Sequence, residues 1–169
     1  MRIWHDKKLG ITRVAYEDGE KERLVNELWV DGKHEYISHN PDSPEAKQLD
    51  RLLPYLPRYE GDIYRGSEEN PYRHNINVGD DFCFGHIAAF SRSQGMGEMH
   101  ALKHDKGTPI LYRVKDSKKG KDIKDISHKA MEEEILVPRD VHYKVVDSSF
   151  ITVDGKVIKL IDLKEKEKN

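Results

Sequence analysis

The sequence predicts an α+β domain, and three observations support that class. The chain has 169 residues, which is enough for one domain with its own hydrophobic core and too few for two domains of typical size. One run, residues 43–57, has helix start and stop signals, whereas most of the chain after residue 60 consists of short runs rich in β-branched and aromatic residues. A helix or two followed by many strands is typical of the α+β class.

The composition excludes several kinds of function. The net charge is −2, with 36% charged and 36% hydrophobic residues, so the chain as a whole has no electrostatic attraction to nucleic acid or anionic membranes. The single cysteine, Cys83, excludes an internal disulfide and a multi-thiolate metal site, and its apolar neighbours predict a buried, inert thiol. The nine histidines are scattered without paired spacing, so no metal site is expected.

The first 42 residues are expected to form an N-terminal extension of unclear role, ahead of a catalytic core at 43–163, in a single domain over 1–169. Residues 11–37 contain short apolar runs, which predict strands or a short helix with a hairpin at 31–33 ("DGK"). The start of the chain lacks the apolar core of a signal peptide, and no run approaches the roughly 20 apolar residues of a membrane span. A cytoplasmic location is therefore expected.

The predicted helix begins after Ser43, whose side chain suits an N-cap, with Pro44 at the first helical position and Glu45 in the first turn. These residue types favour a helix start because they satisfy or dispense with the unpaired N–H groups of the first turn. The apolar face and the end of this helix are assigned to Leu49, Leu52, Leu53, Pro54 and Pro57.

The second half of the chain is predicted to be mostly strands. A polar, glycine-containing segment interrupts these runs at 93–104, a lysine-rich loop is expected after residue 115, and a charged, frayed tail at 164–169. The strand-forming runs lie at 61–66, 80–93, 108–115, 132–138 and 141–163.

Polar side chains stand on or beside three of these strands. Arg65 lies in the first, and Ser91 and Ser93 flank Arg92 at the end of the second. In a later strand, alternation places Glu132 and Glu134 on one face and leaves Glu133 as a solvated residue on the other. Taken singly, each feature has an ordinary explanation: a surface ion pair, a helix cap and an acidic charge run.

Taken in order, these segments resemble the mono-ADP-ribosyltransferases of the Arg-Ser-Glu class, which includes clostridial binary toxins, C3-like exoenzymes and phage transferases. "IYRG" at 63–66 resembles the family's aromatic-Arg-Gly motif, "AAFSRSQ" at 88–94 its Ser-Thr-Ser strand end, and "EEEILVPRDVHYKV" at 132–145 its Glu-x-Glu strand. The resemblance extends over residues 43–147. It departs from the family at Arg92, which stands where the family has Thr.

The resemblance implies a fold of two packed, mostly antiparallel β-sheets with a few flanking helices, and it implies NAD as substrate without a metal. Glu134 would hold the ribose 2′-hydroxyl and stabilise the positive charge that develops when nicotinamide leaves. Arg65 would bind the pyrophosphate, and Gly66 would leave room for the nicotinamide amide. Ser91 is the family's serine on this alignment, with Ser93 as the alternative, and it would orient Glu134.

In the family, a glutamate at the position of Glu132 accompanies the modification of arginine, so the expected acceptor is an arginine of a target protein. The stretch from Lys115 to Lys129 is rich in lysine, and a basic stretch attracts phosphate. ADP-ribosylation of RNA or DNA is therefore an alternative, as are plain NAD hydrolysis and an inactive nucleotide- or partner-binding module. The family also suggests a bacterial or phage toxin or effector, with an immunity protein or antitoxin as a further partner.

Overall fold

The computed structural model describes most of the chain. The described residues are 2–17, 19–31, 34–69, 76–103, 107–127 and 133–167.

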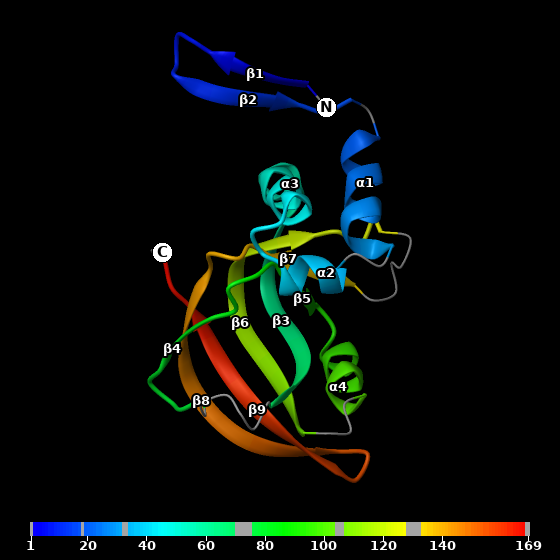
Figure 1. Ribbon diagram of the computed structural model, residues 1–169. Helices are drawn as coiled ribbons and strands as arrows, with labels where there is room; N and C mark the ends of the chain where they lie inside the picture. The colour runs from blue at the N-terminus through cyan, green and yellow to red at the C-terminus, as the bar shows by residue number, and fades with distance from the viewer. Residues whose placement is uncertain are drawn as a thin grey trace.

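Seven strands form one curved sheet in the region predicted as the catalytic core. Their order is β3-β5-β7-β6-β9-β8-β4 (Figure 1). Strand β3 also pairs directly with β6, so the short strands β5 and β7 lie between two long strands that are themselves paired. All neighbours are antiparallel except β6 and β9, which are parallel. The strands are β3 (Arg58–Glu69), β4 (Asp81–Cys83), β5 (Ala88–Ser91), β6 (Thr108–Asp122), β7 (Glu134–Val137), β8 (His142–Val153) and β9 (Lys156–Glu165). The predicted α+β class is confirmed.

Helices cover one end of this sheet and one side of β3. In Figure 1, the first helices lie above the ends of β5 and β7, and α4 lies beside β3. The helices are α1 (Glu20–Val25), the π-helix η1 (Asn26–Val30), α2 (His34–His39), α3 (Pro44–Leu52), the 3-10 helix η2 (Leu53–Tyr55) and α4 (Gln94–Leu102).

The hairpin expected at 31–33 is wrong, because the chain is helical at 20–30 and again at 34–39. The reason is the burial pattern: the adjacent pair Leu24 and Val25 and the pair Leu28 and Trp29 are all buried, and they lie one helical turn apart. The only β-hairpin of the described N-terminal residues is formed earlier, by β1 (Arg2–Asp6) and β2 (Ile11–Ala15).

The helix expected after Ser43 is confirmed. The Ser43 hydroxyl accepts a hydrogen bond from the Ala46 N–H at 3.2 Å, and Pro44 occupies the first turn. Leu49 and Leu52 are fully buried, which fits the predicted apolar face.

The prediction of a lysine-rich loop after residue 115 is also wrong, because β6 continues to Asp122. Arg58 and Tyr59 of β3 pair with Lys121 and Gly120 of β6, so the neighbouring strand supplies backbone partners that hold this stretch extended. The polar, glycine-containing segment forms α4, capped by Ser93, whose hydroxyl accepts from the Met96 N–H at 3.3 Å.

The core has two main parts that meet at β7. Ile135 belongs to the cluster inside the sheet, whereas Leu136 belongs to the cluster beneath the helices. A strand that is buried on both faces has little freedom to shift. The first residue of β7, Glu134, is therefore held in a fixed position.

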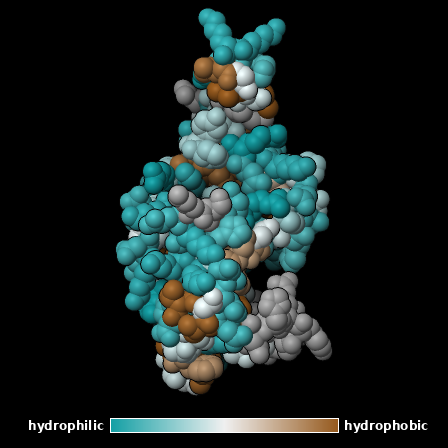
Figure 2. Space-filling model, turned by 90° about the vertical axis from the view of Figure 1, so that its left-hand side faces the viewer, coloured by the Kyte–Doolittle hydropathy of each residue, from teal (hydrophilic) through white to brown (hydrophobic). Residues whose placement is uncertain are grey.

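The surface is largely hydrophilic. Figure 2 shows hydrophobic surface on the projecting hairpin at the top, where Ile3, Trp4 and Leu9 are exposed. Cys83 is partly rather than fully buried, and its thiol donates to the Arg139 carbonyl at 3.4 Å. Among the described residues, no helix has the length and apolar character needed to span a membrane.

Candidate active site

Three of the predicted polar residues are brought together by the strand order β3-β5-β7. Tyr64 is the register partner of Ser91, and Ser91 is in turn the partner of Glu134. Arg65 follows Tyr64, so the three side chains come from adjacent strands. Arg65, Gly66, Ser91 and Glu134 all line one cavity of about 440 Å³, which lies in the size range of small-molecule sites.

Arg65 forms no ion pair with an acidic side chain in the part of the chain that the structure describes. Its Nη1 donates to the Ala89 carbonyl at 3.0 Å, and its guanidinium lies 5.3 Å from the centre of the Phe84 ring. The Nε atom is buried and has no hydrogen-bond partner among the described residues, and no described carboxylate lies within ion-pair distance of the side chain. Burial lowers the pKa of this guanidinium, although an arginine stays charged in water. An anionic ligand would provide a hydrogen-bond acceptor for Nε and a negative charge beside the guanidinium.

Gly66 is required by the packing of α4 against β3. A Cβ at this position would overlap the Gly97 carbonyl oxygen and the Ala101 nitrogen, which are backbone atoms of the helix. Gly66 also lines the cavity. A glycine here is therefore required by helix packing, whereas the resemblance implied only that it leaves room for the nicotinamide amide.

Ser91 and Ser93 have different positions. Ser91 is only 5% exposed and lines the cavity, and its hydroxyl accepts from the Ser93 N–H at 3.0 Å. Ser93 does not line the cavity, and its hydroxyl caps α4. The geometry thus favours Ser91 as the serine that faces a ligand.

Glu134 accepts a short hydrogen bond from a residue of the N-terminal segment. The indole Nε1 of Trp29 donates to Glu134 Oε2 at 2.6 Å, across 105 positions of sequence. Trp29 lies in η1, and its neighbours Val30, His34 and Glu35 line the same cavity. Residues before position 43, whose role the sequence left open, therefore supply part of the cavity wall.

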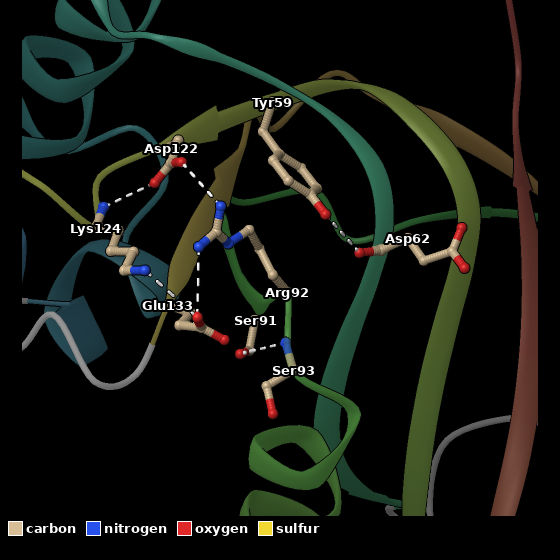
Figure 3. Close-up of polar contacts among 8 residues, drawn as sticks. All are labelled: Tyr59, Asp62, Ser91, Arg92, Ser93, Asp122, Lys124 and Glu133. Atoms are coloured by element: carbon tan, nitrogen blue, oxygen red, sulfur yellow. Dashed lines mark hydrogen bonds and ion pairs between the residues drawn. The ribbon is translucent and has the colours of Figure 1, made fainter.

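Glu133, expected to be solvated, is partly exposed and is also engaged in ion pairs. Its side chain is 34% exposed, and its Oε1 lies 3.4 Å from Arg92 Nη2 and 3.5 Å from Lys124 Nζ. Arg92 also lies 3.7 Å from Asp122. Figure 3 shows these four residues, named here the charged cluster, beside Ser91 at the ends of β5 and β7.

The backbone explains why strand alternation fails before Glu134. Glu133 has a left-handed φ of 48°, and β7 begins only at Glu134. The Glu133 carbonyl accepts from the Arg92 N–H at 3.1 Å, which holds this turn. The alternation of β7 thus begins at Glu134. Glu132 lies outside the described residues. Those residues contain no group of three or more potential metal ligands.

No protein-family model matches the sequence, and no curated protein is similar to it in sequence. Solved structures, in contrast, share its fold. The ADP-ribosyltransferase Vis from Vibrio splendidus, in complex with agmatine, has a TM-score of 0.67 at 17% identity, covering 88% of this chain and 74% of that chain.

Two further bacterial proteins are similar. Plx2a, an ADP-ribosyltransferase toxin from Paenibacillus larvae, has a TM-score of 0.65 at 15% identity and covers 88% of this chain and 86% of its own. Exoenzyme S from Pseudomonas aeruginosa, in complex with 14-3-3 protein beta and bound to carba-NAD, has a TM-score of 0.66 at 13% identity, with coverages of 91% and 76%. The chain has the ADP-ribosyltransferase fold, as the resemblance implied.

The sequence did not predict the cavity residues outside its three motifs. Trp29, His34 and Glu35 come from the N-terminal helices, and His100 and Lys103 come from the C-terminal end of α4. One signal was available for Trp29, since it completes the helical spacing that begins at Leu24 and Val25.

Proposed function

We propose that this protein is an NAD-dependent mono-ADP-ribosyltransferase that transfers ADP-ribose to an arginine of a target protein and releases nicotinamide. One observation carries the proposal: Arg65, a buried arginine whose Nε has no hydrogen-bond partner among the described residues, lines the same cavity as Glu134 and Ser91. A buried, unpaired charge is costly, so a site that keeps one is suited to a ligand of opposite charge. The ADP-ribosyltransferase fold supports the same class of enzyme.

NAD fits the residues present. Its pyrophosphate would accept hydrogen bonds from Arg65, because a guanidinium matches phosphate oxygens better than an ammonium does. The cavity of about 440 Å³ suits the nicotinamide end of the molecule. A related fold, that of exoenzyme S, has been solved with the NAD analogue carba-NAD. We therefore assign NAD binding to Arg65, Gly66, Ser91 and Glu134.

The reaction breaks the bond between the nicotinamide nitrogen and the ribose C1′ and joins C1′ to the acceptor nitrogen, which loses a proton. Positive charge develops on the ribose, as in glycoside hydrolysis. A carboxylate beside the sugar stabilises that charge, and we assign this role to Glu134. The departing nicotinamide is neutral and needs no acid, so a single well-placed carboxylate is sufficient for cleavage.

Arginine is the favoured acceptor for two reasons. The fold relative Vis has been solved with agmatine, a small molecule that has a guanidinium group like that of arginine. In this chain, two of the six lysines expected to attract nucleic acid are engaged within the protein: Lys124 lies beside Glu133, and Lys119 Nζ donates to the Lys166 carbonyl at 2.9 Å. We assign to Glu132 the role of orienting and deprotonating the incoming guanidinium.

The acceptor is tested by incubating the protein with labelled NAD and cell lysate, and by treating the products with nuclease or protease. Label that survives nuclease and is lost with protease supports a protein acceptor. The opposite pattern would indicate nucleic acid and would refute the arginine assignment. Glu132→Gln should keep nicotinamide release and lose transfer, and unchanged transfer would remove its assigned role.

A further inference from the structure

We infer that Trp29 is a positioning residue for Glu134, so that the N-terminal segment completes the active site. The observation is the hydrogen bond from the indole Nε1 to Glu134 Oε2 at 2.6 Å. The inference rests on the proposed function, since it assigns Trp29 a part in the chemistry of Glu134. The donor comes from η1, more than 100 residues before the strand that holds the acceptor.

The indole ring is well held by its own surroundings. Trp29 is only 3% exposed, and it belongs to the core cluster that contains Leu49, Leu52 and Leu136. The Leu136 contact places this cluster directly beneath β7, the strand that begins at Glu134. A ring that is packed on its apolar faces and donates at one edge fixes the direction of that donor.

The local backbone is adapted to this position. Residues Asn26–Val30 form a π-helix, in which the Asp31 N–H donates to the Asn26 carbonyl at 2.8 Å. A π-helical turn is rare and occurs frequently at functional sites, because the extra residue shifts the side chains that follow it. The Asn26 side chain also donates to the Ile126 carbonyl at 3.1 Å, which ties the start of η1 to the segment ahead of β7.

The contact fixes the carboxylate rather than the ligand. A glutamate side chain has three rotatable bonds, and a catalytic carboxylate must be held within about 0.5 Å of its productive position. The bond from Trp29 engages Oε2 and thereby selects one rotamer. The preorganised carboxylate then needs no rearrangement when charge develops on the ribose.

Kinetics separate this role from a structural one. Trp29→Phe keeps an aromatic ring in the core and removes the N–H donor. We expect kcat for nicotinamide release to fall about 10- to 100-fold, with the KM for NAD changed less than about twofold, because Arg65, Gly66 and Ser91 still bind NAD in the variant. Trp4→Phe is the matched control, since Trp4 is the other tryptophan of the chain and lies on the projecting hairpin, and it should leave both constants unchanged.

Fluorescence tests the contact without any enzymatic activity. In the Trp4→Phe background Trp29 is the sole tryptophan, and indole emission responds to a charge placed at its N–H. Glu134→Gln removes that charge and should shift the emission maximum of Trp29. Glu60→Gln, at an exposed carboxylate of β3, should leave the emission unchanged.

The two experiments have distinct outcomes. A fall in kcat at constant KM, together with the emission shift, supports the positioning role. An unchanged kcat in folded Trp29→Phe, or an emission that ignores Glu134→Gln, overturns it. If the folded wild type releases no nicotinamide, the proposed function fails, and the emission experiment still decides whether Trp29 holds Glu134.

Discussion

The two sides of Glu134 are built by different forces. On one side, here called the packed side, apolar burial positions Trp29 and brings the backbone of α4 against Gly66. On the other side, the charged cluster of Arg92, Asp122, Lys124 and Glu133 is held by partly exposed ion pairs at 3.4 to 3.7 Å. Packing is insensitive to salt, whereas exposed ion pairs are screened by it.

The two sides therefore position different parts of the chain around Glu134. The packed side sets the side chain of the catalytic carboxylate and the floor of the cavity. The charged cluster sets the backbone just before it, where Glu133 adopts a left-handed φ of 48°. Since exposed ion pairs contribute little free energy, changes to the packed side should cost more than changes to the charged cluster.

The largest expected effect is at Gly66 on the packed side. Gly66→Ala places a methyl group against backbone atoms of α4 that cannot rotate away, so we expect a loss of about 3 kcal/mol in the free energy of unfolding. Gly95→Ala, on the exposed start of the same helix, meets only the Ser93 hydroxyl at 3.7 Å and should be neutral or stabilising. Urea denaturation measures both, and equal losses would contradict the packing argument.

The next effect concerns Arg65, the neighbour of Gly66 in β3. Arg65→Ala removes a charge-assisted contact to an anionic ligand, so we expect NAD binding to weaken by about 2 to 3 kcal/mol. Arg58→Ala, on the same strand and with an exposed side chain, is the control. Isothermal titration calorimetry measures the affinity, and a change within about 0.5 kcal/mol would show that Arg65 does not bind phosphate.

A smaller effect is expected in the charged cluster. Arg92→Met removes its two ion pairs, which should cost about 1 kcal/mol of stability at low salt and less at 1 M salt. Arg23→Met breaks an exposed i,i+4 pair with Glu27 and serves as a control far from the cavity. A loss in Arg92→Met that does not shrink with salt would mean that packing, and not charge, holds this side.

The smallest effect tests a partly buried carboxylate of α3, Asp50. Burial raises the pKa of Asp50 from its ordinary value of 3.8, against the opposing attraction of Arg139. A raised pKa in the folded state gives stability that is present below the ordinary value and is lost as the pH rises through the raised one.

Asp50→Asn removes that pH dependence. We expect the variant to be more stable than wild type at pH 7, by less than about 1 kcal/mol because the side chain is only partly buried. At pH 3 the two proteins should be equally stable. Thermal denaturation at both values measures the difference, and a gain that is the same at both pH values would contradict a titration of Asp50.

Local patterns in the sequence predicted the part of the site that adjacent strands build. Arg65, Ser91 and Glu134 each lie in or beside a recognisable run, and the strand pairing joins those runs directly. Trp29 was not predicted to be near Glu134, because that contact depends on where a distant helix packs. Glu133 was misplaced for a related reason: its left-handed backbone depends on a hydrogen bond to Arg92, 41 residues away in sequence.

We assign to Glu134 the cleavage of NAD in this cavity, and nicotinamide release measures that step. Wild type and Glu134→Gln are compared at equal concentration with saturating NAD, after circular dichroism has verified that both are folded. We expect steady release by wild type and a rate about 10²- to 10³-fold lower in the variant. Equal rates in the two proteins, or no release by the folded wild type in the presence of lysate, would contradict it.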